Sequence, residues 1–187
     1  MIGTSSARDL VNDRTHYGRP FLTSSRAYAA CTRELARLSD EVLRGVALLG
    51  GAMQDEKPTI RRSPDRCIVQ LGPVALTIAW LRGNNGSVAS GELLAIVWRG
   101  AVAPRKDHNH PERPSKGPAP LGATSLWEQV FSAVGESEQT WGWHPPGVEI
   151  ERCSSIELAE RCVGRLQAAY MDGATAPIIS PDAVVLS

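Results

Sequence analysis

The chain has 187 residues, of which 42% are hydrophobic and 21% charged, proportions typical of one globular domain rather than a disordered chain. Its 20 Lys and Arg residues balance its 20 Asp and Glu residues, which disfavours a general nucleic-acid binder, because such proteins carry a basic excess to neutralise phosphates. This balance also leaves self-association unopposed by net charge. No apolar run is long enough for a membrane span or a signal peptide, so we expect a cytoplasmic protein.

We expect residues 1–23 to form a flexible N-terminal arm, because they are polar and show no sustained hydrophobic period. A long helix is predicted over residues 24–50, where apolar side chains recur at spacings of three and four residues. Such a stripe fits either a coiled-coil seam or a helix packed on a sheet. The repeat is short and is interrupted at Gly45, which favours the helix on a sheet.

An antiparallel meander is predicted after this helix, with strands over 67–71, 74–82 and 92–100 and a possible edge strand over 59–62. The two longer strands are apolar on both faces, whereas a sheet with one solvated face would alternate apolar with polar residues. We therefore expect both faces to be covered, either by helices on both sides or by helices on one side and a second subunit on the other. One face carries mostly small side chains, which would suit the close approach of a helix.

A proline-rich loop is predicted over residues 101–123, because five prolines lie between residues 104 and 120. His108 and His110 could provide two metal ligands and His144 a third. A structural zinc site needs four protein ligands, and no other His or Cys lies near in sequence. We therefore expect no metal and no cofactor.

The same loop is basic, and its cationic side chains could contact phosphates or an acidic partner. The candidate binding residues in it are Arg105, Lys106 and Arg113. No aromatic residue lies among them for stacking on bases, so an exposed loop that makes charged contacts is the simpler interpretation.

Two more helices are predicted, over residues 124–135 and 154–173, because each stretch opens with a Ser followed three residues later by a Glu, the pattern of a capping box. The capping pairs are Ser125 with Glu128 and Ser154 with Glu157. A strand over 148–152 would place Glu149 and Glu151 on one face, either as paired carboxylates for acid–base chemistry or as the wet side of an edge strand.

Trp141 and Trp143 lie in a Gly- and Pro-rich loop over residues 136–147, followed by His144. Two tryptophans are costly to expose, so they either plug the edge of the core or form a recognition patch for a partner. These three residues complete the set of candidate binding residues.

These elements predict one α+β domain over residues 24–173 and a C-terminal tail over 174–187. Its sheet is expected to be a meander of three to five strands, flanked by the long N-terminal helix and the C-terminal helices. In order alone this layout resembles double-stranded-RNA-binding domains, small secretion chaperones and profilin-like proteins. No motif of those families is present, so no family is assigned.

The function expected from these features is a non-catalytic protein–protein interaction or assembly module, as a homodimer or as a subunit of a larger complex. No nucleophile motif, phosphate-binding loop or zinc-protease motif is present, which favours a protein that is not an enzyme. The four cysteines are expected to be reduced and mostly buried. The alternative is a small-ligand or nucleic-acid-binding module that uses the basic loop and the two tryptophans.

Overall fold

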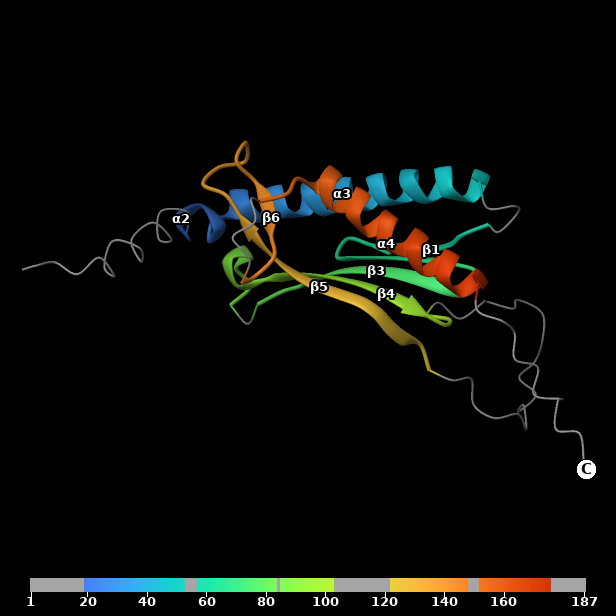
Figure 1. The fold of residues 1–187 in the computed structure, drawn as a ribbon. Helices are drawn as coiled ribbons and strands as arrows, with labels where there is room; N and C mark the ends of the chain where they lie inside the picture. Colours follow the sequence, from blue (N-terminus) through green and yellow to red (C-terminus); the bar gives the residue numbers. More distant parts are fainter. Residues whose placement is uncertain (1–18, 53–56, 84, 103–121, 148–151, 176–187) are drawn as a thin grey trace, which may run out of the picture.

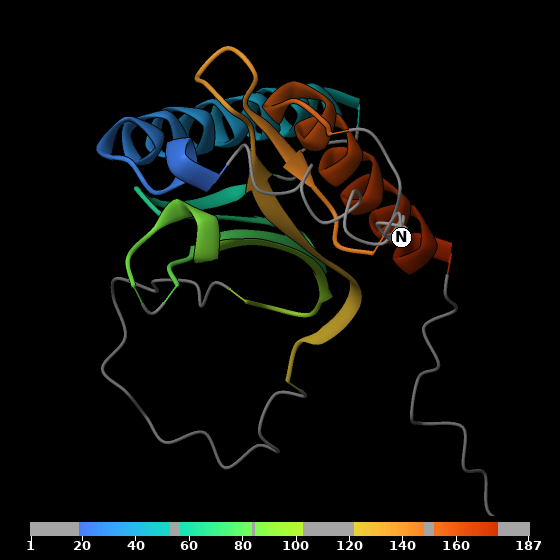
Figure 2. The same ribbon diagram turned by 90° about the vertical axis from the view of Figure 1, so that its left-hand side faces the viewer.

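The computed structural model describes residues 19–52, 57–83, 85–102, 122–147 and 152–175. Six antiparallel strands form one sheet in chain order, and two long helices lie side by side over one of its faces (Figures 1 and 2). The elements are α2 (Arg19–Leu22), α3 (Ser25–Ala52), β1 (Thr59–Ser63), β2 (Arg66–Leu71), β3 (Val74–Leu81), η1 (Val88–Ser90), β4 (Glu92–Arg99), β5 (Thr124–Val134), β6 (Gly142–His144) and α4 (Ser155–Thr175). The predicted α+β class is confirmed, with six strands rather than three to five.

The helix predicted over 24–50 is confirmed as α3, and it packs on the sheet. Its buried side chains join those of β2, β3 and β4 in one core cluster. The inner stripe consists of Ala27, Cys31, Leu35, Leu38, Val42 and Val46. Tyr28, which the heptad pattern assigned to this stripe, is 45% exposed, because the helix turns its alanines toward the sheet at that end.

Gly45 lies where α3 packs directly against a side chain of α4. A Cβ atom at this position would lie 2.9 Å from Cγ2 of Val163 on α4, nearer than side chains normally approach. The interruption in the apolar repeat therefore has a packing role, because the missing side chain of Gly45 leaves room for the Val163 side chain.

The meander predicted from the sequence is confirmed, including the edge strand β1. The two-residue turn between β2 and β3 contains Gly72 with a φ of 53°, and a tight hairpin of this kind requires a residue with positive φ. Cys67, Val69 and Leu71 of β2 face the helices, as does the set Val74, Leu76, Ile78 and Trp80 of β3.

The helix predicted over 124–135 is wrong, because these residues form β5, the longest strand of the sheet at 11 residues. β5 pairs with β4 on one side and with β6 on the other. A bulge between Val97 and Trp98 of β4 shifts the register and hides the simple alternation. Pairing satisfies the backbone groups that β4 would otherwise expose at a sheet edge, and it buries Phe131 against the helices.

The predicted helix over 154–173 is confirmed as α4, and so is its capping box. The Ser154 hydroxyl accepts a hydrogen bond of 3.2 Å from the Glu157 N–H, and the Glu157 carboxylate accepts one of 2.7 Å from the Ser154 N–H. The second bond lowers the pKa of the Glu157 carboxyl.

Replacing Ser154 with alanine should lower the free energy of unfolding by about 1 kcal/mol, because one N–H at the start of α4 then loses its acceptor. Urea unfolding followed by circular dichroism measures this change. Ser154→Thr is the matched control, since it keeps the hydroxyl and should unfold near the wild-type midpoint. Equal midpoints for the alanine variant and the wild type would contradict the capping role.

Several predicted segments lie outside the described residues, among them residues 1–18 of the N-terminal arm, the strand with Glu149 and Glu151, and residues 176–187 of the tail. Residues 19–22 form the short helix α2, and Leu22 is buried in the core. Within the described ranges, no helix is both long and apolar enough to cross a membrane.

Candidate functional site

Trp143, on strand β6, is fully buried between the sheet and the helices. Its indole packs edge-on against Trp80 of β3, with ring centroids 6.0 Å apart, and against Trp141 at 5.6 Å. The backbones of Trp143 and Cys153 also exchange two hydrogen bonds, of 2.8 and 2.9 Å, which tie β6 to the start of α4. These contacts support the interpretation of Trp143 as a plug of the core rather than a recognition residue.

A chain of hydrogen bonds runs from this indole to the first helix. Nε1 of Trp143 donates to the Ser155 hydroxyl at 2.9 Å, and that hydroxyl donates to the Glu34 carboxylate at 2.8 Å. Ser155 is 2% exposed, so the chain satisfies two buried polar groups and joins β6, α4 and α3. The role of this chain is structural, because the indole N–H and the Ser155 hydroxyl are both already used as donors within the protein.

Trp141 and His144, the other candidates from this loop, are half-buried. Nε1 of Trp141 is buried and has no acceptor among the described residues. His144 pairs with Ser132 of β5, so its side chain lies on the face of the sheet away from Trp143. The two tryptophans and the histidine are therefore divided between the core and the surface, and they do not form one patch.

The basic loop candidates Arg105, Lys106 and Arg113 lie outside the described residues, as do His108 and His110. The described part of the chain contains no group of three His, Cys, Asp or Glu side chains placed to hold a metal.

All four cysteines are free and buried, as predicted. Burial raises the pKa of the Cys31 and Cys162 thiols to about 12, and it raises the pKa of Cys67 and Cys153 as well. Since the thiolate is the reactive form, these thiols are poor nucleophiles in the folded protein.

The face of the sheet away from α3 and α4, which we call the open face, has no helix over it in the described part of the chain (Figures 1 and 2). Its centre is apolar, because β3 and β4 are apolar on both faces. By register, the apolar side chains on it are Ile68, Ala75, Ala79, Leu81, Leu94, Ile96, Trp98 and Val130. Of the two expected coverings, the described residues do not show helices on both sides, and a second subunit on the open face stays a prediction.

The apolar side chains of the open face differ in exposure, because larger neighbours cover some of them. Leu81 is 45% exposed, whereas Ala75 is fully buried and Ile96 is 7% exposed. The Trp98 indole extends across β3 and donates a hydrogen bond of 3.1 Å to the Thr77 hydroxyl, and Ala75 lies directly opposite Trp98. Ile68, Leu94, Trp98 and Val130 remain half-buried and accessible from this side.

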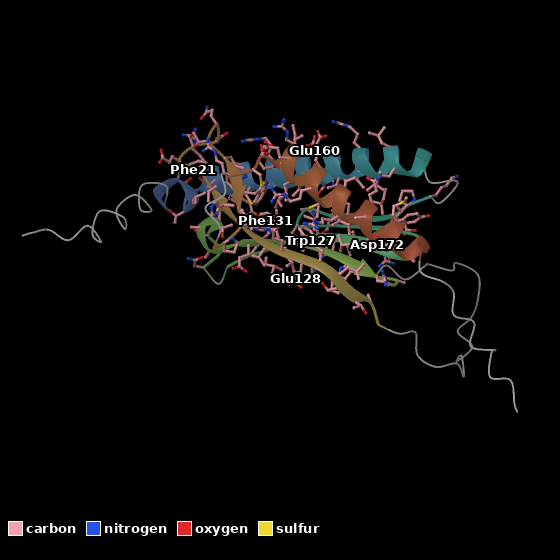
Figure 3. The ribbon with its side chains drawn as sticks, in the orientation of Figure 1. Phe21, Trp127, Glu128, Phe131, Glu160 and Asp172 are labelled. Carbon is pink, nitrogen blue, oxygen red and sulfur yellow. The ribbon has the colours of Figure 1, made fainter. Side chains whose placement is uncertain are left out.

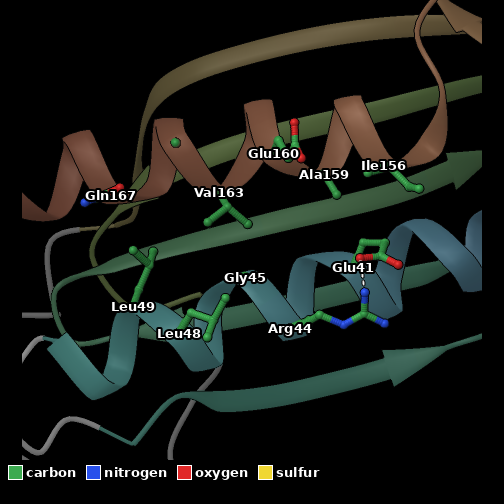
Figure 4. A pocket seen from close by; sticks show the side chains of 11 residues that line it. Glu41, Arg44, Gly45, Leu48, Leu49, Ile156, Ala159, Glu160, Val163 and Gln167 are labelled. Carbon is green, nitrogen blue, oxygen red and sulfur yellow. Dashed lines mark hydrogen bonds and ion pairs between the residues drawn. The ribbon is translucent and has the colours of Figure 1, made fainter.

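A hollow lies between α3 and α4, with a volume of about 410 Å³ (Figure 4). Its floor is Gly45, Ala159 and Val163, and Leu48, which is 74% exposed, lies on its rim. Glu41 and Arg44 on the rim form an ion pair of 2.7 Å, so their charges are already matched within α3. This hollow is an open seam between the packed helices, and Glu160 and Gln167 of α4 also line it.

The sequence pattern indicated an apolar second face, but it missed the charged residues at the border of that face. Glu128 was assigned to a helix cap, whereas in β5 it lies opposite Ile96 and points away from the helices (Figure 3). The signal that could have found it was the alternation of Trp127, Gln129, Phe131 and Ala133, whose even spacing is that of a strand.

Comparisons with protein-family models, with curated proteins and with solved structures gave no match.

Proposed function

We propose that this chain is a non-catalytic protein-binding module of the cytoplasm, and that it binds its partner through the open face of its sheet. The observation that carries the proposal is the row of half-buried apolar side chains on that face, formed by Ile68, Leu94, Trp98 and Val130. Covering them with a partner removes apolar area from water at about 25 cal/mol per Å². In an antiparallel sheet with one permanently solvated face, apolar residues alternate along each strand with polar ones.

Two further features support this proposal over an enzyme or a ligand-binding protein. The buried thiols are protonated, and the buried Ser155 hydroxyl is engaged in hydrogen bonds on both sides. Four free cysteines also suit a reducing compartment such as the cytoplasm. The open face has a broad apolar centre with charges at its borders, the usual anatomy of a protein–protein interface.

A photo-crosslinking amino acid placed at position 81 tests the proposal in extracts of cells that express the protein. Leu81 lies on the open face and is 45% exposed, so we expect ultraviolet light to attach a protein there. The matched control is position 48, another exposed leucine that lies on α3. Equal capture at both positions, or none at position 81, would overturn the proposal.

Leu94→Lys should reduce capture at position 81 at least tenfold, because it puts a charge into the apolar centre of the interface. The fold should persist, since Leu94 is half-buried and a lysine stem can lie along the sheet with its amine in water. Circular dichroism checks that persistence. Undiminished capture by a folded Leu94→Lys protein would count against the open face as the binding surface.

A further inference from the structure

One row of side chains across the open face is nearly symmetric about strand β3. Reading from β1 to β5, residues directly opposite one another are Arg61, Ile68, Thr77, Ile96 and Glu128. The order is thus a base, an isoleucine, a threonine, an isoleucine and an acid. Opposite residues in a sheet share a face, so all five belong to the open face.

We propose that the partner of the open face is a second copy of this chain, packed face to face about a twofold axis that runs parallel to β3. The inference rests on the proposed function, since it names the partner of the same surface. About this axis, Arg61 of one copy faces Glu128 of the other, Ile68 faces Ile96, and Thr77 meets its own counterpart.

The charges at the two borders of the face select this arrangement. Arg61 and Arg66 lie on the β1–β2 side, and Glu92 and Glu128 lie on the β4–β5 side, all exposed. An axis parallel to the strands places the basic border of each copy over the acidic border of the other. An axis perpendicular to the strands would place β1 over β1 and β5 over β5, so that like charges would meet.

Among the described residues, no ion pair competes for the acidic border. The ion pairs of the described residues join helix, loop and β1 side chains, and neither Glu92 nor Glu128 takes part in them. Figure 3 shows Glu128 on the side of β5 opposite to the helices. These carboxylates are therefore available to a second copy, and the zero net charge of the chain does not oppose its approach.

The axis runs along β3, where three of the four side chains on the open face are small and the Trp98 indole of β4 reaches across to Thr77. Strand β3 presents Ala75, Thr77, Ala79 and Leu81 to the open face, and larger side chains flank the first three on β2 and β4. Sheets packed face to face lie about 10 Å apart with their strands within about 30° of each other. Because Ile96 is only 7% exposed, the half-buried Ile68, Leu94 and Trp98 would make most of the apolar contact between the copies.

The size of the face sets the expected affinity. Strands β3 and β4 have eight residues each. With a rise of about 3.4 Å per residue and about 4.8 Å between strands, β2 to β5 offer roughly 27 by 19 Å, or about 500 Å² per copy. Two such faces are at the low end of specific interfaces, so we expect a dissociation constant of about 1–100 µM.

Charge reversal tests the arrangement by sedimentation velocity over about 1 to 200 µM protein. Arg61→Glu and Glu128→Arg should each weaken the homodimer at least tenfold, because each places like charges at two symmetric contacts. A mixture of the two variants should recover dimerisation to within a few-fold of wild type, because Arg61 then meets Glu128, and the new Arg meets the new Glu. Glu160→Arg on α4 is the control, and it should dimerise as wild type does.

A wild-type chain that stays monomeric throughout this range would overturn the proposal, as would a mixture that associates no better than its components. A Glu160→Arg variant that loses dimerisation would also overturn the proposal, because the two copies would then meet through the helix face rather than the open face. Crosslinking at position 81 distinguishes the failure of the homodimer from the failure of the proposed function. Adducts with a different protein would support the protein-binding function and contradict a second copy as the partner.

A cysteine introduced at position 77 gives a second readout that needs no charge change. Thr77→Cys should be joined across the axis by a short bismaleimide, whereas the native thiols are buried and protonated and should not react. Leu48→Cys on α3 is the matched control. Crosslinked dimers that form equally at position 48, or at neither position, would contradict the arrangement.

Discussion

Replacing Trp143 with alanine should lower the free energy of unfolding by about 3–5 kcal/mol, the range for removing a large aromatic from a packed core. The side chain is fully buried and touches the rings of Trp80 and Trp141. Its loss would also remove the donor to Ser155 and loosen the chain to Glu34. Thermal and urea unfolding measure the change.

Trp141→Ala is the matched control for this experiment, because it removes the same ring from the same loop. Trp141 is half-buried and its Nε1 has no acceptor in the described part of the chain, so this variant should cost clearly less stability than Trp143→Ala. A Trp143→Ala protein that unfolds at the wild-type midpoint but loses its partner would reverse the assignment and make Trp143 a recognition residue.

Raising the pH above 9 should destabilise the protein through Cys31 and Cys162. In the unfolded chain these thiols ionise near their usual pKa of 9.0, whereas in the folded protein burial raises the pKa of each to about 12. Their stabilising contribution is thus complete below pH 9 and is lost as the pH rises toward 12. The loss is about 1.4 kcal/mol per thiol for each pH unit above 9, or about 4 kcal/mol for both thiols at about pH 10.5.

Comparison with the Cys31→Ala/Cys162→Ala variant isolates this effect, since lysine and tyrosine ionisation is common to both proteins. Urea unfolding at about pH 7.5 and about pH 10.5 gives the difference in unfolding free energy between wild type and variant. We expect that difference to move by about 4 kcal/mol in favour of the variant. A difference that stays constant with pH would show that the thiols ionise equally in both states.

Local periodicity was sufficient to predict α3, α4 and strands β1 to β4. In the helices the hydrophobic spacing agrees with the end signals, as at the capping box of Ser154 and Glu157, and in β2 to β4 the apolar runs agree with the turn residues that flank them, whereas β1 was only a possible edge strand. Where local signals agree, tertiary contacts only reinforce them.

β5 could not be predicted in this way, because its local signals conflict. Ser125 and Glu128 imitate a helix cap, while Trp127, Val130 and Phe131 are good strand residues at a spacing that also fits a helix. The deciding interaction is the backbone pairing of β5 with β4, which lies more than 20 residues away across the predicted loop. No local window contains that information.

The candidate site was predicted only in part for a similar reason. The sequence singles out Trp141 and Trp143 as unusual, but only the position of β6 places Trp143 in the core and leaves Trp141 half-buried at its edge. The charged borders of the open face arise from strand order, which brings Glu128 next to Ile96 and Arg61 next to Ile68.

The amino-acid sequence by itself determined that β3 and β4 have two apolar faces, since side chains alternate along any strand. It did not determine which face the helices cover. The tertiary structure places the helices over the larger side chains of β3, namely Leu76, Ile78 and Trp80, but over the smaller side chains of β4, namely Leu93, Ala95 and Val97. The physical reason is that the face on which a side chain lies is fixed by the register between paired strands and by where the helices pack, and neither is encoded within a single strand.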